Sequence, residues 1–295
     1  MISAFRTGYL AVIGRPNVGK STLTNRLVGA KVSITSKKAQ TTRHRIHGVL
    51  TTADAQFIFV DTPGFQMTHK NALNRLMNRS VTSTFADVDV ILLVVEAGRW
   101  GAGETEIARM LPADIPVLLV INKIDRLAAK AELLPFIARV SLLHDFAEIV
   151  PLSAEKGLGT DELLATVARY LPEGPPAFDA DDITDRSERF MASEILREKL
   201  FRNLGEELPY GIAVEIEKFE QEGELRRIHA AVIVDKAGHR SIVIGKAGER
   251  LKRISTDARK EMETLFGGKV WLETWIKVKG GWADDERALK SLGYD

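Results

Sequence analysis

The sequence predicts an α/β domain with a mostly parallel sheet, followed by a smaller α+β domain. From residue 9 to about 171, short apolar runs rich in valine and isoleucine alternate with longer stretches of helical periodicity. Strands joined by crossover helices produce this alternation, and such sheets are covered on both faces. After a segment rich in proline and aspartate at 172–185, the order becomes helix, two strands, long helix and strand. A length of 295 residues also favours two domains, at roughly 150 residues each.

The apolar runs place the elements of the first domain, which we expect to span 1–172. Its strands are expected at 9–13, 46–50, 56–60, 90–95, 116–121 and 147–150. Its helices are expected near 20–28, 69–85, 103–111, 130–143 and 160–171. Residues 173–187 combine proline and glycine with four aspartates and little to bury, which predicts a linker.

The second domain is expected at 188–295. Apolar residues recur with helical spacing over 188–203, and we expect the basic residues of that helix, Arg197, Lys199 and Arg202, to be solvated. Strands are expected at 212–219, 228–234 and 270–279, with an amphipathic helix before the last. On this last strand Trp271 and Trp275 alternate with apolar residues, and packing under a helix is expected over stacking on bases. The tail, 283–292, predicts a short amphipathic helix packed on its own domain.

Composition excludes several classes of protein. With 45% hydrophobic and 27% charged residues the chain resembles soluble globular proteins rather than disordered ones. The absence of cysteine excludes disulfides, thiolate zinc sites and iron–sulfur clusters, and favours the cytoplasm as the location. No apolar run approaches the roughly 18 residues of a membrane span, and the formal net charge of +1 selects no partner.

A phosphate-binding loop follows the first expected strand. The pattern G-x-x-x-x-G-K-[ST] lies between a strand and a helix, where glycines let backbone N–H groups curl around phosphate oxygens. In this pattern Lys20 reaches the β- and γ-phosphates and the Ser21 hydroxyl binds Mg²⁺. A glycine-rich turn with an incidental lysine is the alternative. The candidate residues are Gly14, Arg15, Pro16, Asn17, Val18, Gly19, Lys20, Ser21 and Thr22.

Three further motifs each follow a different expected strand. Because the carboxyl ends of parallel strands share one edge of a sheet, these motifs should meet at the phosphate loop. Asp61 would hold Mg²⁺ through water, and the Gly64 N–H could sense a γ-phosphate. Asp125 would accept from the N1–H and N2–H₂ donors of guanine, so the sequence predicts a guanine site and disfavours an ATPase. The candidates are Asp61, Thr62, Pro63 and Gly64; Asn122, Lys123 and Asp125; and Ser153, Ala154 and Glu155, with the Ala154 N–H as a donor to guanine O6.

At these residues the chain resembles the Era family, within the TrmE–Era–EngA group of bacterial GTPases. The resemblance implies that a threonine closes over Mg²⁺; we favour Thr42 and keep Thr41 as the alternative, while a plain polar surface loop would read the same way. Phe65 stands where Ras-like enzymes carry a water-orienting glutamine, so hydrolysis should be slow unless assisted. The resemblance implies that Asn17 assists by coordinating K⁺, against a simple loop-capping role. The expected catalytic residues are Lys20, Asn17, Thr42 and Gly64, and the expected metal ligands are Ser21, Thr42 and Asp61 for Mg²⁺ and Asn17 for K⁺.

A second motif, Gly245-Lys-Ala-Gly248, begins the amphipathic helix of the second domain. Residues 240–260 carry seven basic side chains against two acidic ones. A Gly-x-x-Gly loop with a lysine is the nucleic-acid clamp of KH domains, although alone such a string is more often a turn, and the basic residues alone would suit a solvated helix face. The element order resembles the type II KH domain that ends Era proteins, which implies a short helix at 241–244 where propensity favours a strand. The expected RNA-binding residues are Gly245, Lys246, Ala247, Gly248, Arg250, Lys252 and Arg253.

Together these features predict a GTPase coupled to single-stranded RNA binding. The resemblance implies that the RNA is the 3′ end of 16S ribosomal RNA, that the process is 30S subunit assembly, and that the protein is a cytoplasmic monomer. It also leaves open a peripheral association with the inner membrane. The alternatives are a nucleotide-gated RNA clamp with negligible hydrolysis, which Phe65 favours, and a GTPase of the same group acting on tRNA or on the large subunit.

Overall fold

The computed structural model describes residues 4–36, 38, 40–65, 72–205 and 208–294. Within these ranges the chain forms two compact units. The first contains the described residues of 1–33, 42–69 and 77–185, and the second contains those of 34–41, 70–76 and 186–295. The first residues of the helix expected near 69–85, 69–71, lie outside the described residues.

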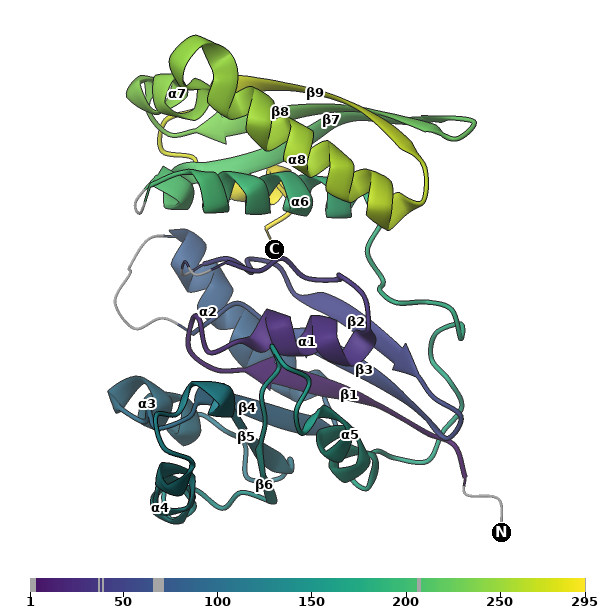
Figure 1. Ribbon diagram of the computed structural model, residues 1–295, viewed down its shortest axis with the longest axis vertical. Helices are drawn as coiled ribbons and strands as arrows, with labels where there is room; N and C mark the ends of the chain where they lie inside the picture. Colours follow the sequence, from purple (N-terminus) through teal and green to yellow (C-terminus); the bar gives the residue numbers. More distant parts are fainter. Residues whose placement is uncertain (1–3, 37, 39, 66–71, 206–207, 295) are drawn as a thin grey trace. The chain divides into compact units, whose positions relative to one another are not determined.

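The first unit is built on a six-stranded sheet with the order β2-β3-β1-β4-β5-β6 (Figure 1). Only β2 runs antiparallel to its neighbour, and the other pairs described are parallel. The predicted fold class is therefore confirmed. The strands are β1 (Arg6–Ile13), β2 (Ile46–Thr51), β3 (Ala55–Asp61), β4 (Val90–Glu96), β5 (Val117–Asn122) and β6 (Glu148–Pro151).

Helices cover both faces of this sheet, as its continuous apolar strands require. On one face α1 (Lys20–Val28) and α5 (Thr160–Ala168) bury Leu23 and Leu163 against Val12 and its neighbours. On the other face the adjacent residue of β1, Ile13, packs with the apolar side chains of the remaining helices. These are α2 (Ala72–Thr84), α3 (Ala102–Arg109) and α4 (Leu133–Val140).

The segment predicted as a linker lies along the first unit. The Pro172 carbonyl accepts from Thr7 N–H at 3.1 Å, and Ile183 O accepts from Val49 N–H at 2.9 Å. Between them, the buried Gln56 side chain accepts from the N–H groups of Ala177 and Phe178 at 2.7 and 2.9 Å. Residues 172–184 therefore bond to β1, β2 and β3 of the sheet, so the segment has more fixed contacts than its composition suggests.

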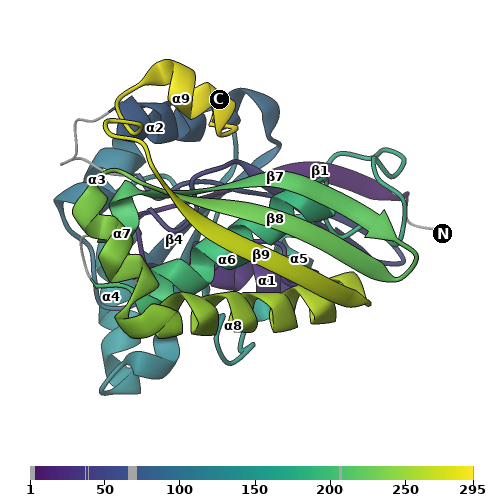
Figure 2. The same ribbon diagram turned by 90° about the horizontal axis from the view of Figure 1, so that it is seen from above.

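The second unit has a three-stranded sheet, β7-β8-β9, in which β7 and β8 are antiparallel and β8 and β9 parallel (Figure 2). Two long helices cover one face, and Ile195, Leu200, Ile254 and Met262 from these helices form its core with the strands. The elements are α6 (Glu188–Asn203), β7 (Ile212–Glu222), β8 (Leu225–Val234), α7 (Ala237–Ile244), α8 (Glu249–Phe266), β9 (Lys269–Val278) and α9 (Glu286–Ser291).

Local sequence explains several of these boundaries. Ser187 caps α6 by accepting from the Phe190 N–H, and Gly267, at φ 67°, ends α8. Residues 241–244 belong to helix α7, as the resemblance implied, although their β-branched residues favour a strand. The tail helix α9 buries Ala288 and Leu289, and the neighbouring Trp282 stacks on Tyr294.

One expectation about α6 is wrong. Arg197 is 1% exposed and Lys199 is also largely buried, whereas both were expected to be solvated. The helical stripe predicts only the face that meets the sheet, and in the structure residues 34–41 cover another face of the same helix.

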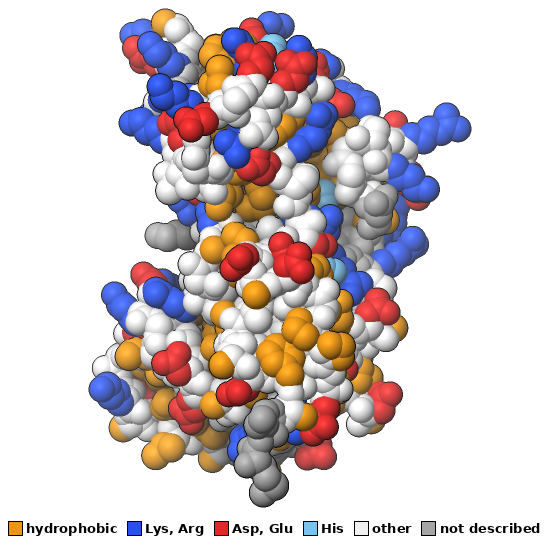
Figure 3. All heavy atoms as spheres, turned by 90° about the vertical axis from the view of Figure 1, so that its right-hand side faces the viewer, with side chains coloured by type: hydrophobic (Ala, Val, Ile, Leu, Met, Phe, Trp, Pro, Cys, Tyr) orange, Lys and Arg blue, Asp and Glu red, His pale blue; other side chains and the backbone are white. Residues whose placement is uncertain are grey.

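No helix within the described part of the chain is long and apolar enough to cross a membrane. On the faces drawn in Figure 3, basic and acidic side chains are interspersed. This mixture agrees with a net charge near zero.

Candidate functional site

The phosphate loop connects β1 to α1 through backbone angles that only glycine accepts. Gly14 has φ +147°, and a Cβ there would lie 2.3 Å from the Val94 carbonyl oxygen. Gly19 has φ +103°, and its Cβ would lie 2.3 Å from Asn122 Nδ2. Asn17, at φ 66°, is a residue type that tolerates this region. The two glycines thus let the loop approach β4 and the Asn122 side chain.

Lys20 lies buried at the start of α1. Its Nζ donates to the carbonyl oxygens of Gly14 and Arg15, each at 3.1 Å, so the ammonium lies inside the loop. Burial lowers the pKa of Lys20 to about 8, while the Asp61 carboxylate acts in the opposite direction. A lysine enclosed by this loop is a cation placed for phosphate oxygens.

Three oxygen-bearing side chains lie beside the loop. Ser21 Oγ and Thr42 Oγ1 are 2.8 Å apart, and both belong to the first unit. Asp61, at the end of β3, is fully buried, and its Oδ1 has no hydrogen-bond partner among the described residues. Burial raises the pKa of Asp61, against the hydrogen bond from Ser33 and the charge of Lys20. The Thr41 hydroxyl is instead hydrogen-bonded to Ser36 Oγ and the Lys38 carbonyl.

Residues 62–65 pass close to the phosphate loop. Thr62 Oγ1 donates to the Val12 carbonyl at 2.9 Å, and the Phe65 N–H donates to the Gly14 carbonyl at 3.3 Å. A Cβ on Gly64 would lie 2.9 Å from Pro16 Cα, so the glycine allows the two loops to touch. The Phe65 ring packs against the apolar core on one face of the sheet and offers no hydrogen-bonding group.

Asn122 joins three loops at the end of β5. Its Nδ2 donates to the Val18 carbonyl at 2.9 Å, and its Oδ1 accepts from the N–H groups of Lys123 and Ala154 at 2.7 and 3.0 Å. The Ala154 N–H, expected to donate to guanine O6, is therefore engaged by Asn122 in this structure. Lys123 Nζ donates to the Asn17 carbonyl at 2.6 Å, so its alkyl chain crosses from one loop to the other.

The remaining motif residues follow β5 and β6. Asp125 is exposed. The loop after β6 is held by Arg26 of α1, which donates to the carbonyls of Ala154 and Glu155 at 3.1 and 2.8 Å. Ser153 Oγ accepts from the Lys156 N–H at 3.2 Å. The four motifs thus lie at one edge of the sheet, as their positions after parallel strands predict.

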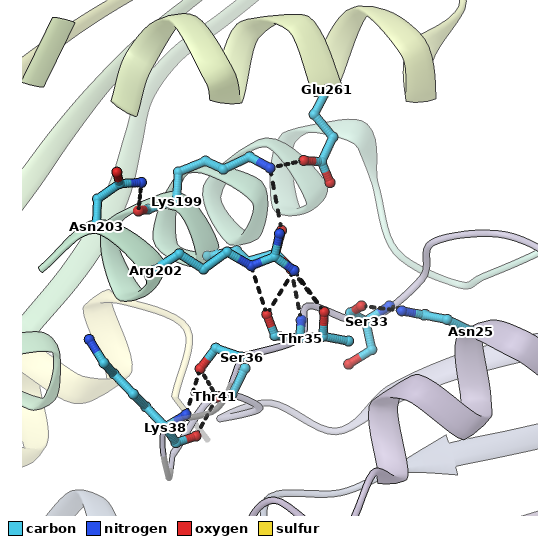
Figure 4. A network of polar contacts seen from close by, with 11 residues as sticks. Asn25, Ser33, Thr35, Ser36, Lys38, Thr41, Lys199, Arg202, Asn203 and Glu261 are labelled. Carbon is cyan, nitrogen blue, oxygen red and sulfur yellow. Dashed lines mark hydrogen bonds and ion pairs between the residues drawn. The ribbon is translucent and has the colours of Figure 1, made fainter. Parts of the chain in front are cut away.

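Residues 34–41, just before Thr42, pack within the second unit (Figure 4). Glu198 Oε1, on α6, accepts from the Thr35 N–H at 2.9 Å, and Arg202 Nη2 donates to Thr35 Oγ1 at 2.9 Å. Lys38 Nζ donates to the carbonyl of Phe201 at 2.7 Å, and Arg197 donates to the carbonyls of Gln40 and Thr41. The helix thereby fixes the backbone of this segment at several points.

The Gly-x-x-Gly loop of the second unit is exposed and strained. Gly245 has φ 74°, and a Cβ there would lie 2.6 Å from Arg250 Cβ. Ala247, at φ 50°, is one of the non-glycine residues with positive φ, and Gly248 follows at φ 81° as the N-cap of α8. Lys246 and Lys252 are exposed, so cations stand at the N-terminus of α8, where the helix dipole also favours an anion.

A hollow of about 360 Å³ lies between α8 and β9, adjoining this loop. Its lining combines polar side chains with two leucines, and Ser255 Oγ lies 2.8 Å from Thr274 Oγ1. The lining residues are Gly248, Leu251, Lys252, Ser255, Thr256, Arg259, Leu272 and Thr274. The hollow therefore combines apolar contact, hydroxyls and cations, as a pocket for a nucleotide base and its phosphate would require.

The expectation for the two tryptophans is wrong. Leu272 and Ile276 of β9 face the helices, and Trp271 and Trp275 alternate with them on the opposite face, where both contact the His229 ring. Trp271 is 40% exposed. Because α6 and α8 cover one face of this sheet, alternation alone could not tell which set of residues they bury.

Sequence reasoning missed several residues that support the predicted ones. Glu96 accepts from Lys123 Nζ at 2.6 Å, Glu104 bonds Arg15 at 3.3 Å, and Ser33 donates to Asp61. None belongs to a motif. Only Glu96, which ends an apolar strand whose carboxyl end lies at the site edge, carried a usable signal.

Two family models match different parts of the chain. A family model described as a 50S ribosome-binding GTPase matches residues 9–123, and a KH domain model matches residues 207–283. The GTPase Era of Nitrosomonas eutropha is 57% identical over 293 residues, which is 99% of each chain.

Two solved structures are similar over almost the whole chain. Each is 41% identical, covers 98% of this chain and 99% of its own, and superimposes with a TM-score of 0.95. One is a variant of Aquifex aeolicus Era bound to GDP.AlF4⁻. The other is Era in complex with MgGDPNP and nucleotides 1506–1542 of 16S ribosomal RNA.

Proposed function

The chain belongs to the Era family of GTPases, and from this premise we propose that it couples GTP hydrolysis to binding of the 3′ end of 16S ribosomal RNA. The single observation that carries the nucleotide half is the meeting of four motifs, each following a different strand, at one sheet edge. The Gly-x-x-Gly loop beside the hollow between α8 and β9 supports RNA binding by the second unit. We further propose that the protein acts in 30S subunit assembly as a cytoplasmic monomer. Peripheral association with the inner membrane is part of the same proposal.

The first step is recognition of the guanine nucleotide. Lys20 would release the Gly14 and Arg15 carbonyls and donate to the β- and γ-phosphate oxygens. Asp125, exposed at the same edge, would accept from N1–H and N2–H₂ of guanine, a pair of donors that adenine lacks. Asn122 and Lys123 hold this base loop against the phosphate loop, so the two halves of the nucleotide are read at a fixed spacing.

The residues beside the loop fit a magnesium ion. The donors are all oxygens, which Mg²⁺ prefers, and the buried Asp61 Oδ1 lacks any partner in the described part of the chain. We assign Ser21, Thr42 and Asp61 to the ion. The hydroxyl of Thr42, the favoured residue, lies beside Ser21, which supports Thr42 over the alternative Thr41. When bound, the ion would neutralise charge on the phosphate oxygens.

Hydrolysis needs a water molecule placed in line with the γ-phosphorus. The water oxygen forms a bond to the γ-phosphorus while the bond between the γ-phosphorus and the β–γ bridging oxygen breaks, which releases phosphate and leaves GDP. Phe65 has no group that could orient this water. Gly64 would donate its N–H to the γ-phosphate, and Asn17, exposed on the phosphate loop, would bind K⁺ near the developing charge. Turnover should therefore be slow in sodium and faster in potassium.

Potassium dependence tests this half of the proposal. We expect multiple-turnover GTP hydrolysis to be several-fold faster in potassium than in sodium. Asn17→Gly keeps the positive φ of the loop and removes the amide, so it should abolish the difference. No hydrolysis in either salt would instead favour the nucleotide-gated clamp, and an unchanged potassium effect in the variant would remove Asn17 from the mechanism.

A single strand matching the 3′ end of 16S ribosomal RNA tests the other half. Ala247 is exposed at a positive φ that Asp and Asn both accept, so Ala247→Asp and Ala247→Asn differ mainly in charge. Titration at fixed salt should give tight binding for the native chain and Ala247→Asn, and weak binding for Ala247→Asp. Equal binding by all three would assign the second unit to another partner. Tighter binding with a GTP analogue than with GDP would support the coupling.

A further inference from the structure

Asp61 is held by a serine that no motif marks. Ser33 is fully buried, and its Oγ donates to Asp61 Oδ2 at 2.7 Å. The second carboxylate oxygen, Oδ1, is buried without a hydrogen-bond partner among the described residues. A carboxylate that is fixed at one oxygen presents its other oxygen in a defined direction.

Ser33 is fixed in turn by Asn25 of α1 (Figure 4). Asn25 Oδ1 accepts from the N–H groups of Val32 and Ser33 at 3.0 and 2.9 Å, and its Nδ2 donates to the Ser33 carbonyl at 2.6 Å. Val32 is itself fully buried in the core beneath α1. The Asn25 side chain therefore fixes the backbone of Ser33, which carries the hydroxyl that bonds Asp61.

We infer that Ser33 is a positioning residue for magnesium-dependent nucleotide binding, and that it acts by holding Asp61 so that Oδ1 remains available to the ion and its water ligands. Its hydroxyl donates its hydrogen bond to Asp61. Ser33 is therefore a partner of a metal ligand and is not itself a ligand. This inference rests on the proposed assignment of Asp61 to the magnesium site. Groups that orient a metal-binding side chain typically change metal affinity by about 10- to 100-fold when removed.

Dissociation of a fluorescent GDP from the full chain tests the inference without using hydrolysis. In the native chain, adding Mg²⁺ to protein in EDTA should slow dissociation. In Ser33→Ala, the Mg²⁺ concentration that gives half of the maximal slowing should rise about tenfold. The rate of GDP dissociation in EDTA should stay unchanged. Ser33→Thr keeps the hydroxyl and should restore the native requirement. Ser33→Cys, close to serine in volume with a weaker donor, should be intermediate and serves if the alanine variant fails to fold.

Asp61→Asn separates the failure of this inference from the failure of the proposed site. If Asp61→Asn loses the magnesium effect while Ser33→Ala keeps the native requirement, the role of Ser33 is wrong and the metal site stands. If Asp61→Asn keeps the magnesium effect, the metal site itself is wrong. A Ser33→Ala variant that speeds dissociation equally with and without Mg²⁺, or that binds Mg²⁺ more tightly, also overturns the inference.

Discussion

Replacing Arg197 by methionine should destabilise the second unit more than any change at an exposed arginine of the same helix. Arg197 is 1% exposed and donates to both carboxylate oxygens of Glu194, at 2.8 and 2.6 Å. It also donates to the carbonyls of Gln40 and Thr41, and its guanidinium lies over the Phe201 ring. Methionine keeps most of the apolar chain, so the loss is mainly electrostatic and does not include a large cavity.

The magnitude follows from burial. Removing one partner of a buried ion pair costs about 3–5 kcal/mol, because the remaining charge loses its compensation. The two carbonyls add about 1 kcal/mol for each hydrogen bond lost, partly offset by local relaxation. We therefore expect the free energy of unfolding to fall by roughly 5 kcal/mol. Replacing Glu194 by methionine as well should recover about 2 kcal/mol, because the buried carboxylate that has lost Arg197 is then removed too.

Urea unfolding followed by tryptophan fluorescence measures this loss in one unit. Of the four tryptophans only Trp100 lies in the first unit, so a Trp100→Phe background restricts the signal to the second. Arg202→Met is the matched control. Arg202 also bonds Glu198 and Thr35, but it is 48% exposed. The buried Glu198 keeps its hydrogen bonds from Thr35 and the charge of Lys199, so the loss of Arg202 should cost about 1 kcal/mol or less.

Two results would refute this reasoning. One is an Arg197→Met loss no larger than that of Arg202→Met, which would mean that burial does not set the cost. The other is a double variant no more stable than the single one, which would mean that the charge of Glu194 is compensated elsewhere.

Three further predictions concern the two sites. Asp125→Asn should weaken GDP binding by at least about tenfold relative to ADP, since one charged acceptor is lost, and competition binding measures the ratio. Gly19→Ala should destabilise the first unit by about 1–3 kcal/mol and abolish GDP binding, because φ is +103° and the new Cβ would lie 2.3 Å from Asn122 Nδ2; thermal unfolding and GDP titration check both. Lys252→Ala should lower the slope of log affinity for RNA against log salt by about 0.7, whereas Lys260→Ala, an exposed lysine of α8 outside the hollow, should leave it unchanged.

The meeting of the four motifs at one sheet edge was predictable because each motif follows an apolar run. Gly14 and Gly19 reveal a loop that needs positive φ, and Asp61, Asn122 and Ser153 each follow an apolar run that ends at the same sheet edge. The mostly parallel sheet and its two helical layers follow from the same runs.

Other features depend on contacts between residues far apart in sequence, which no periodicity encodes. Arg197 lies off the apolar stripe of α6 and is buried only because residues 34–41 cover it. The choice between Thr41 and Thr42 rests on which hydroxyl meets Ser21, and that needs a folded chain. Ser33 has no neighbouring signal, since its partner Asp61 is 28 residues away.

The packing of residues 34–41 within the second unit limits how this chain can be divided. A fragment ending at residue 172 would keep all six strands and the phosphate loop. It would lose Arg197, Glu198 and Arg202, to which Thr35, Gln40 and Thr41 are bonded. A chimera that joins this half to a different RNA-binding module would have the same defect beside Thr42. Dividing the chain at residue 172 therefore removes the hydrogen-bond partners of residues 34–41. Nucleotide binding measured on residues 1–172 alone would describe this segment without those partners.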